Sequence, residues 1–262
     1  MRRLFLLLFL AVSAGAQEEN LVRYLIPVTG GPTPGANGSL WTTELTVHNP
    51  RDGQIFVFGD RCGGLISSPP CENNWYITPL TSMRLLVSPS SFSKGAFIYL
   101  PDDPNYGPTP MTLRVRDLSK DAQNLGTEVP IVRMSEFAQL VIVTDVPTDD
   151  RYRATLRLYN SSEAPRRVTM RVFPLSGGTP IETRTVDLAG VNLLVFDPTP
   201  LHPGYAEVDP LSPLVRASAQ RVRIEIEDPL RHVVSPPPPP IWGLVSITNN
   251  ETQQVTMITP HP

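Results

Sequence analysis

The sequence has few of the residues that build metal and redox sites. It contains two cysteines, Cys62 and Cys71, and four isolated histidines, His48, His202, His232 and His261. A structural zinc site needs four ligands, and a redox pair more typically has the Cys-x-x-Cys spacing, which is absent here. We therefore expect no metal and no other cofactor. In an exported chain, a disulfide between Cys62 and Cys71 is favoured.

The motifs of the common hydrolases are also missing. No Gly-x-Ser-x-Gly occurs anywhere in the chain. Ser91-Phe92-Ser93-Lys94 spells Ser-x-x-Lys, but the Ser-Asp-Asn and Lys-Thr-Gly motifs that accompany it in penicillin-recognising enzymes are absent. We therefore predict that the protein is not an enzyme, and a hydrolase ranks third among the candidate functions.

The chain has no surplus of positive charge. Lys94 and Lys120 are its only lysines, and the 22 basic residues are outnumbered by 25 acidic ones. If residues 1–16 are removed, the loss of Arg2 and Arg3 leaves 20 basic residues against the same 25 acidic residues. Because nucleic acid is bound largely through Lys and Arg, no nucleic-acid partner is expected.

Long hydrophobic runs are absent except at the N-terminus. Met1-Arg2-Arg3 precedes the apolar run Leu4–Val12, and Ala14-Gly15-Ala16 follows it. This order is typical of a signal peptide over residues 1–16. The run is too short to span a bilayer, so a secreted or periplasmic protein with no membrane span after cleavage is expected. The alternative is an N-terminal membrane anchor.

What the sequence does have is proline and a repeated strand pattern. Thirty prolines exclude long helices. Apolar and polar residues alternate in Trp41–Asn49, and the same pattern returns in Tyr152–Asn160. A period of two indicates a half-buried strand. The repeat predicts two tandem β-sandwich domains, residues 17–136 and 137–262, with single-turn helices at most.

Both copies end on an asparagine and a polar turn, which predicts hairpins. Segments 54–58 and 167–173 are expected to return as partner strands. Closing hairpins are expected to pair 95–100 with 111–116 and 221–226 with 241–247.

These patterns resemble those of uncharacterised secreted bacterial proteins with tandem Ig-like β-sandwich repeats. The matching segments are Ile26–Val28, Pro34–Leu45, Arg116–Ser119, Gly126–Pro130, Tyr152–Asn160 and Val245–Asn249. The resemblance implies an all-β fold of two Ig-like antiparallel sandwiches and implies export. It carries no activity and no site residues.

Two loops have more than one interpretation. Pro236–Pro240 is expected to form polyproline II. It is either a docking ligand for an aromatic groove or a stiff hairpin loop. The predicted strands 221–226 and 241–247 flank it closely, which favours the loop. Asp102-Asp103 near Asn105, and Asp149-Asp150 near Asp145, offer oxygen ligands for calcium but are more typical of solvated turns.

The candidate ligand platform consists of Trp75, Tyr76 and Tyr106, whose rings suit stacking on sugars. Trp41 and Trp242 lie at apolar positions of predicted strands with alternating residues and are therefore expected in the core. The leading hypothesis is a non-enzymatic exported structural or interaction module of the cell envelope or extracellular space, with an unidentified protein or glycan partner. The alternative is a carbohydrate-binding module.

Overall fold

The structure is a computed structural model, and it describes residues 21–59, 74–85, 95–101, 103–120, 125–191, 203–231 and 233–260. The predicted signal peptide, the Cys62 and Cys71 pair and the Ser91–Lys94 motif lie outside these ranges. The signal peptide and the disulfide therefore stay predictions.

The part of the chain before residue 137 forms two antiparallel sheets, called here the N-terminal sheets. The first has the order β10 (Val132–Arg133), β1 (Leu21–Ile26), β7 (Ala96–Pro101), β4 (Ile55–Gly59) and β5 (Asn74–Ile77). The second has the order β2 (Thr33–Pro34), β3 (Leu40–His48), β8 (Met111–Asp117) and β9 (Thr127–Val129), with β6 (Ser82–Leu85) also paired to β3.

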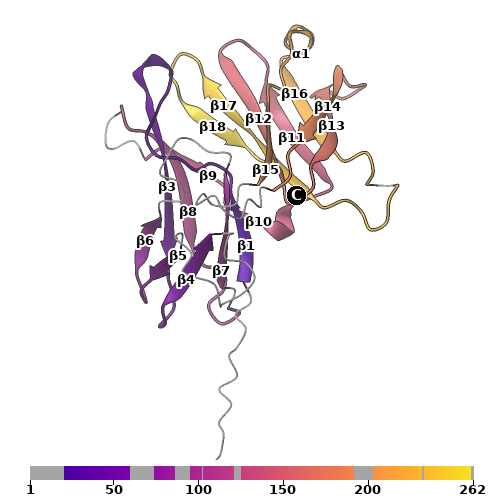
Figure 1. The fold of residues 1–262 in the computed structure, drawn as a ribbon. Helices are drawn as coiled ribbons and strands as arrows, with labels where there is room; N and C mark the ends of the chain where they lie inside the picture. The colour runs from indigo at the N-terminus through magenta and orange to yellow at the C-terminus, as the bar shows by residue number, and fades with distance from the viewer. Residues whose placement is uncertain are drawn as a thin grey trace, which may run out of the picture.

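The rest of the chain forms two further antiparallel sheets, the C-terminal sheets. One has the order β11 (Leu140–Pro147), β16 (Arg221–Glu227), β13 (Arg166–Pro174) and β14 (Glu182–Leu188). The other has the order β15 (Gly204–Val208), β12 (Tyr152–Asn160), β17 (Ile241–Asn249) and β18 (Val255–Ile258). Figure 1 shows the N-terminal sheets, mainly indigo to magenta, beside the C-terminal sheets, pink to yellow.

The fold is all-β, as predicted. In the described ranges, helix is confined to α1 (Pro213–Ser218) and the 3-10 turns η1 (Ala36–Gly38) and η3 (Met134–Glu136). Of the helices described, none is long and apolar enough to cross a membrane.

The repeated strands alternate as the sequence predicts. Leu45 and Val47 of β3 and Leu156 and Leu158 of β12 are fully or almost fully buried, while the residues between them are partly exposed. Each strand therefore turns one apolar face to a core. One core lies between the two N-terminal sheets and another between the two C-terminal sheets.

The predicted hairpins are wrong. β3 and β4 belong to different sheets, and so do β7 and β8, β12 and β13, and β16 and β17. Each of these connections crosses from one sheet to the facing sheet. The alternation of apolar and polar residues identifies which face of a strand is buried. It is the same for two strands paired in one sheet and for two strands packed face to face in different sheets, so it does not reveal which strands are hydrogen-bonded to each other.

A buried asparagine holds each of the two repeated crossings. Asn49 is 0% exposed, and its Nδ2 donates to the carbonyl oxygens of Gly53, Ile77 and Thr78 at 2.8, 3.0 and 3.1 Å. Asn160 is also 0% exposed, and its Nδ2 donates to Ala164 at 2.9 Å and Ala189 at 3.0 Å.

In both crossings, Oδ1 of the asparagine accepts from the backbone N–H two residues later, at 3.0 Å from Arg51 and 2.9 Å from Ser162. The asparagine thus satisfies carbonyl groups that a sharp turn leaves without partners. The sequence repeat reflects this shared corner.

Candidate functional site

The two predicted platform residues on β5 point to opposite faces of the strand, because consecutive strand residues alternate. Trp75 is half-buried and packs against the core between the N-terminal sheets. Tyr76 is 50% exposed, and its ring meets Phe56 edge-on with 4.6 Å between centroids. The structure therefore does not bring Trp75 and Tyr76 onto one surface.

Tyr106 lies in the loop between β7 and β8 and contacts a different partner. The guanidinium carbon of Arg51 is 5.8 Å from its ring centroid. Arg51 is itself buried, and its Nη2 donates to the Pro101 carbonyl at 2.8 Å. Among the contacts of the described residues, none joins Tyr106 to Trp75 or Tyr76, so the three rings do not form one platform.

The outer face of β4 and β5 carries a different set of rings, called here the aromatic strip: Phe58, Phe56 and Tyr76. Phe58 and Phe56 are stacked with 5.9 Å between centroids, and Tyr76 extends the strip across the strand pair. The two phenylalanines were not among the platform residues predicted from the sequence. Their alternation with buried Ile55 and Val57 was a signal that they face outward.

The loop acids have partners typical of turns. Asp103 Oδ1 accepts from the backbone and side chain of Asn105 at 2.9 and 3.0 Å. A hydrogen bond from Arg151 lowers the pKa of Asp149. Across the described ranges, no group of three or more His, Cys, Asp or Glu side chains that could hold a metal is found. Asp102 lies outside those ranges.

A third apolar cluster joins the N-terminal and C-terminal sheets. Its buried members, called here the junction cluster, are Leu25, Phe97, Val132, Phe137, Tyr159, Val191, Trp242 and Leu244. Trp242 is 5% exposed, so its predicted burial is confirmed, although it lies between the two pairs of sheets rather than inside one pair.

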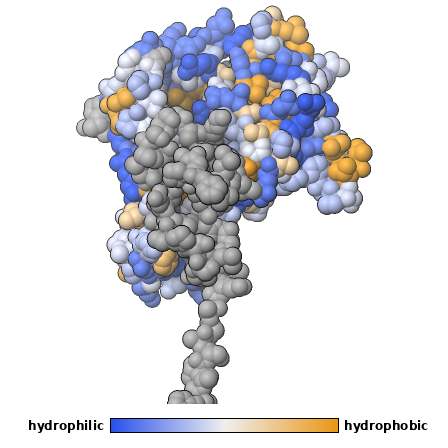
Figure 2. Space-filling view, viewed as in Figure 1, coloured by the Kyte–Doolittle hydropathy of each residue, from blue (hydrophilic) through white to orange (hydrophobic). Residues whose placement is uncertain are grey.

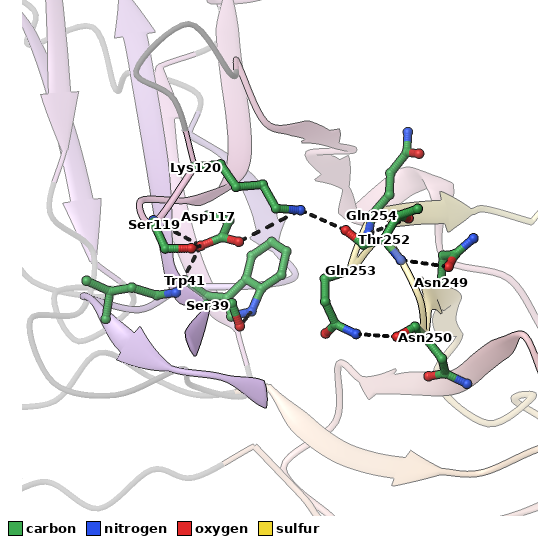
Figure 3. A network of polar contacts seen from close by, with 11 residues as sticks. Ser39, Trp41, Asp117, Ser119, Lys120, Asn249, Asn250, Thr252, Gln253 and Gln254 are labelled. Carbon is green, nitrogen blue, oxygen red and sulfur yellow. Dashed lines mark hydrogen bonds and ion pairs between the residues drawn. The ribbon is translucent and has the colours of Figure 1, made fainter. Parts of the chain in front are cut away.

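Hydrogen bonds also cross the junction. The Tyr159 hydroxyl donates to the Pro27 carbonyl at 2.6 Å, and burial raises the pKa of this phenol above its usual value. Figure 3 shows Lys120 reaching from the end of β8 to the turn before β18, where its Nζ donates to the Thr252 carbonyl at 2.9 Å. Thr127 Oγ1 donates to the Val255 carbonyl at 2.7 Å. These contacts fix the two pairs of sheets to each other.

A cleft of about 250 Å³ lies at this junction, called here the junction cleft. It is lined on one side by Val28, Thr33, Pro34, Gly35, Trp41 and Val115, and on the other by Arg153, Arg157, Ser246, Thr248, Gln253, Val255 and Met257. Both sides therefore contribute to it. No single motif in the sequence spans residues this far apart.

Trp41 is held in position at the cleft rather than buried in the core. Its indole Nε1 donates to Ser39 Oγ at 2.9 Å. A Cβ at Gly35 would come within 2.6 Å of two indole atoms, so only glycine permits this close approach. The prediction that Trp41 is a core residue is thus wrong in part: it packs on the core and also lines the cleft.

Arg157 of β12 is one of two cations that line the cleft. Burial lowers the pKa of its guanidinium, but nearby Tyr159, Tyr205 and Glu207 together raise it more. Arg157 Nε is buried without a hydrogen-bond partner. Within the described residues, neither Arg157 nor Arg153 is ion-paired with a carboxylate. The cleft lining contains these two cations and no acidic side chain.

The loop between β16 and β17, residues 228–240, exposes apolar side chains. Leu230, Val233 and Val234 are 50, 76 and 42% exposed. Figure 2 shows an apolar patch at the end of the projection that this loop forms in Figure 1. The loop includes Pro236–Pro240. Because β16 and β17 lie in different sheets, it is a connection between sheets and not the predicted hairpin loop.

Comparisons with known proteins give no relative: no family model matches the chain, and neither the curated proteins nor the solved structures include a significant match.

Proposed function

We propose that the protein is an exported, non-enzymatic interaction module made of two tandem Ig-like sandwich domains, residues 17–136 and 137–262. The absence of any sheet that mixes strands from both sides of residue 137, within the described ranges, supports the two domains. Separate cores between each pair of sheets support them as well. The signal-like residues 1–16 support export to a secreted or periplasmic location.

The observation that carries the proposal is the exposed apolar tip of the β16–β17 loop. Leu230, Val233 and Val234 lie within five residues of one another and face solvent. Contiguous exposed apolar side chains mark protein interaction sites, because leaving them in water costs free energy that a partner recovers.

The base of this loop is anchored, so the tip is presented in a defined orientation. Arg166 forms an ion pair with Asp228, and their side chains are only 6 and 7% exposed. Asp228 Oδ1 also accepts from the Leu230 backbone at 2.8 Å. At the other end, Ser161 Oγ donates to the Pro240 carbonyl at 3.0 Å.

Between these anchors, Pro236–Pro240 has fixed φ angles and no backbone donors. A loop that is already ordered loses less entropy when it binds. The partner that suits it is a protein with an apolar or aromatic groove, the kind of surface that receives proline-rich segments.

The test is site-specific photo-cross-linking in the producing cell. A photoreactive amino acid replaces Val233 at the loop tip, and in a matched control it replaces Ser176, which is exposed at the turn between β13 and β14. We expect a discrete cross-linked protein from position 233 that is absent from position 176. Val234→Asp should reduce this product, because a charge is costly in an apolar groove.

The same products from both positions, or none from position 233, would contradict the proposal. A Val234→Asp variant that cross-links as efficiently as the parent would show that the apolar tip does not carry the contact.

The second candidate function is carbohydrate binding, and the aromatic strip favours it. Tyr76 is 50% exposed beside Phe56 and Phe58, and rings on an open sheet face suit stacking against sugars. On a glycan array, Tyr76→Ala should lose binding. Tyr106→Ala is the control, because Tyr106 is also exposed but does not contact the strip. Equal loss in both variants would favour the platform predicted from the sequence instead.

A further inference from the structure

The face of the β12–β17 strand pair that is turned toward the N-terminal sheets has an apolar part that is buried and a polar part that is not fully covered. Tyr159, Trp242 and Leu244 belong to the junction cluster and are at most 5% exposed. Further along the same strands, Arg157, Arg153, Ser246 and Thr248 line the junction cleft. Because packing closes only one part of this face, the other part is left as a polar recess.

The lining of this recess carries two cations and no carboxylate, and Glu207 lies close enough to Arg157 to raise its pKa. Arg153 and Arg157 are four residues apart on one strand, so they project from the same face. The nearby carboxylate Glu207 accepts from Tyr205 at 2.7 Å, and no ion pair joins it to Arg157 among the residues described. Arg157 lines the cleft although its Nε atom is buried from solvent. A guanidinium has five N–H donors and binds a carboxylate in a bidentate manner.

The opposite wall offers a flat ring. Trp41 is fixed by Ser39 and by its close approach to Gly35. Figure 3 shows Trp41 facing the turn that carries Gln253 across the junction. The Gln253 amide is held by its bond to the Asn250 carbonyl at 2.9 Å. An indole face with fixed polar groups opposite it is the combination that binds a sugar ring.

We propose that the junction cleft binds a carboxylate-bearing saccharide, with carboxylate groups on Arg157 and Arg153 and a sugar ring against Trp41. The cleft volume of about 250 Å³ limits the bound part to a small unit, such as the end of a uronic-acid chain. This site is separate from the β16–β17 loop and from the aromatic strip. The inference holds whether or not either of those surfaces binds a partner.

The experiment is calorimetric titration of the full mature chain with trigalacturonate, with the neutral galacto-trisaccharide as the comparison ligand. We expect trigalacturonate to bind roughly tenfold tighter than the neutral sugar, because charge-assisted hydrogen bonds are lost with the carboxylates. High salt should weaken the binding. Arg157→Gln should reduce affinity by roughly tenfold or more, and Trp41→Leu should also reduce it.

Arg167→Gln is the matched control. Arg167 also lies on a strand, but its sheet does not contain the β12 and β17 residues of the cleft, and it forms an exposed ion pair with Asp187 on the neighbouring strand. It should bind as the parent does. Arg153→Gln provides a second cleft variant if Arg157→Gln does not fold, because Arg153 is exposed and its replacement disturbs no packing.

Four results would overturn the inference. Equal affinity for the neutral trisaccharide would remove the carboxylate from the recognition. Equal binding of an oligoglutamate would show that the cleft selects charge and not a saccharide. Loss of binding in Tyr76→Ala but not in Arg157→Gln would assign the sugar to the aromatic strip, which supports carbohydrate binding but not the cleft. No binding of trigalacturonate would reject the site.

Discussion

Replacing Asn160 by alanine tests the physical basis of the repeated corner. Asn160 is 0% exposed and forms three hydrogen bonds, two donated to Ala164 and Ala189 and one accepted from Ser162. Alanine removes all three and leaves the backbone groups of these residues without partners. The crossing from β12 to β13 then loses the side chain that holds it.

The expected loss follows from these bonds. A hydrogen bond contributes about 0.5–1.5 kcal/mol net, and an unsatisfied buried group costs about 1–3 kcal/mol. Three bonds that share one side chain therefore predict a loss of about 3 kcal/mol in the free energy of unfolding. Against a typical domain stability of about 5–15 kcal/mol, the domain should remain folded with a clearly reduced midpoint.

Urea denaturation followed by circular dichroism measures this loss. Asn250→Ala is the control, because Asn250 is exposed and its side chain donates one hydrogen bond, to Asp150 at 2.8 Å. It should cost less than about 1 kcal/mol. If Asn160→Ala costs no more than this control, the corner does not stabilise the crossing and the interpretation of the repeat is refuted.

Three further predictions concern other parts of the chain. Asn49→Ala should destabilise the proposed N-terminal domain at least as much as Asn160→Ala destabilises the C-terminal one, since Asn49 Nδ2 shares its two hydrogens among three carbonyl oxygens and Oδ1 accepts one bond, and calorimetry of the two transitions checks this. The raised pKa of Tyr159 means that the unfolded chain releases this proton near pH 10 while the folded chain keeps it, so stability should fall above pH 10 by up to about 1.4 kcal/mol per pH unit. Denaturation midpoints of the parent and Tyr159→Phe at alkaline pH measure that fall, and an equal fall in both would contradict the assignment. Peptide mapping without reductant should recover Cys62 and Cys71 as one bonded pair, worth about 2.5–3 kcal/mol in the chain-entropy model, and free thiols in the exported protein would refute it.

The sequence was enough to predict the two repeated strands and the scarcity of helix. Alternation in Trp41–Asn49 and Tyr152–Asn160 is a local property, and the structure has β3 and β12 in these segments with one buried face each. Proline content limited helix length in the same local way. Properties that depend on neighbouring residues in the sequence, such as strand alternation and helix length, were therefore predicted correctly.

Strand pairing was predicted wrongly because it is not local. The turn after Asn49 can close a hairpin or carry the chain to a facing sheet, and both outcomes bury the same alternating residues. Asn49 favours the crossing to the facing sheet, because its side chain donates hydrogen bonds to the carbonyl oxygens of Ile77 and Thr78, which are 28 and 29 residues away. That partnership is visible only in three dimensions.

The segment between β14 and β16 contains two elements, β15 and α1, that were not predicted from the sequence. Pro203, Pro210 and Pro213 lie in or next to them. Ser212 caps α1 by accepting from the Val215 backbone, and Pro213 occupies the first turn. Ser-Pro at a helix start is a recognisable signal, so α1 was predictable from sequence.

The candidate site was predictable only in part. Tyr76 was identified from its aromatic character, and it is exposed as a ligand platform requires. The junction cleft combines Trp41 with Arg157, which are far apart in the sequence and meet only because two pairs of sheets pack together. Assigning Trp41 to the core followed from its alternation, which does not show where a sandwich ends.

The most direct test is whether the two proposed domains move as one body, because the cleft exists only if the junction between the two pairs of sheets holds. Nitrogen-15 relaxation of the mature chain measures the tumbling time of each domain separately. We expect one shared tumbling time, and Trp242→Ala, which removes the largest ring of the junction cluster, should separate the two values. Two different, shorter times in the parent protein would show that the domains tumble independently, and would contradict the fixed junction.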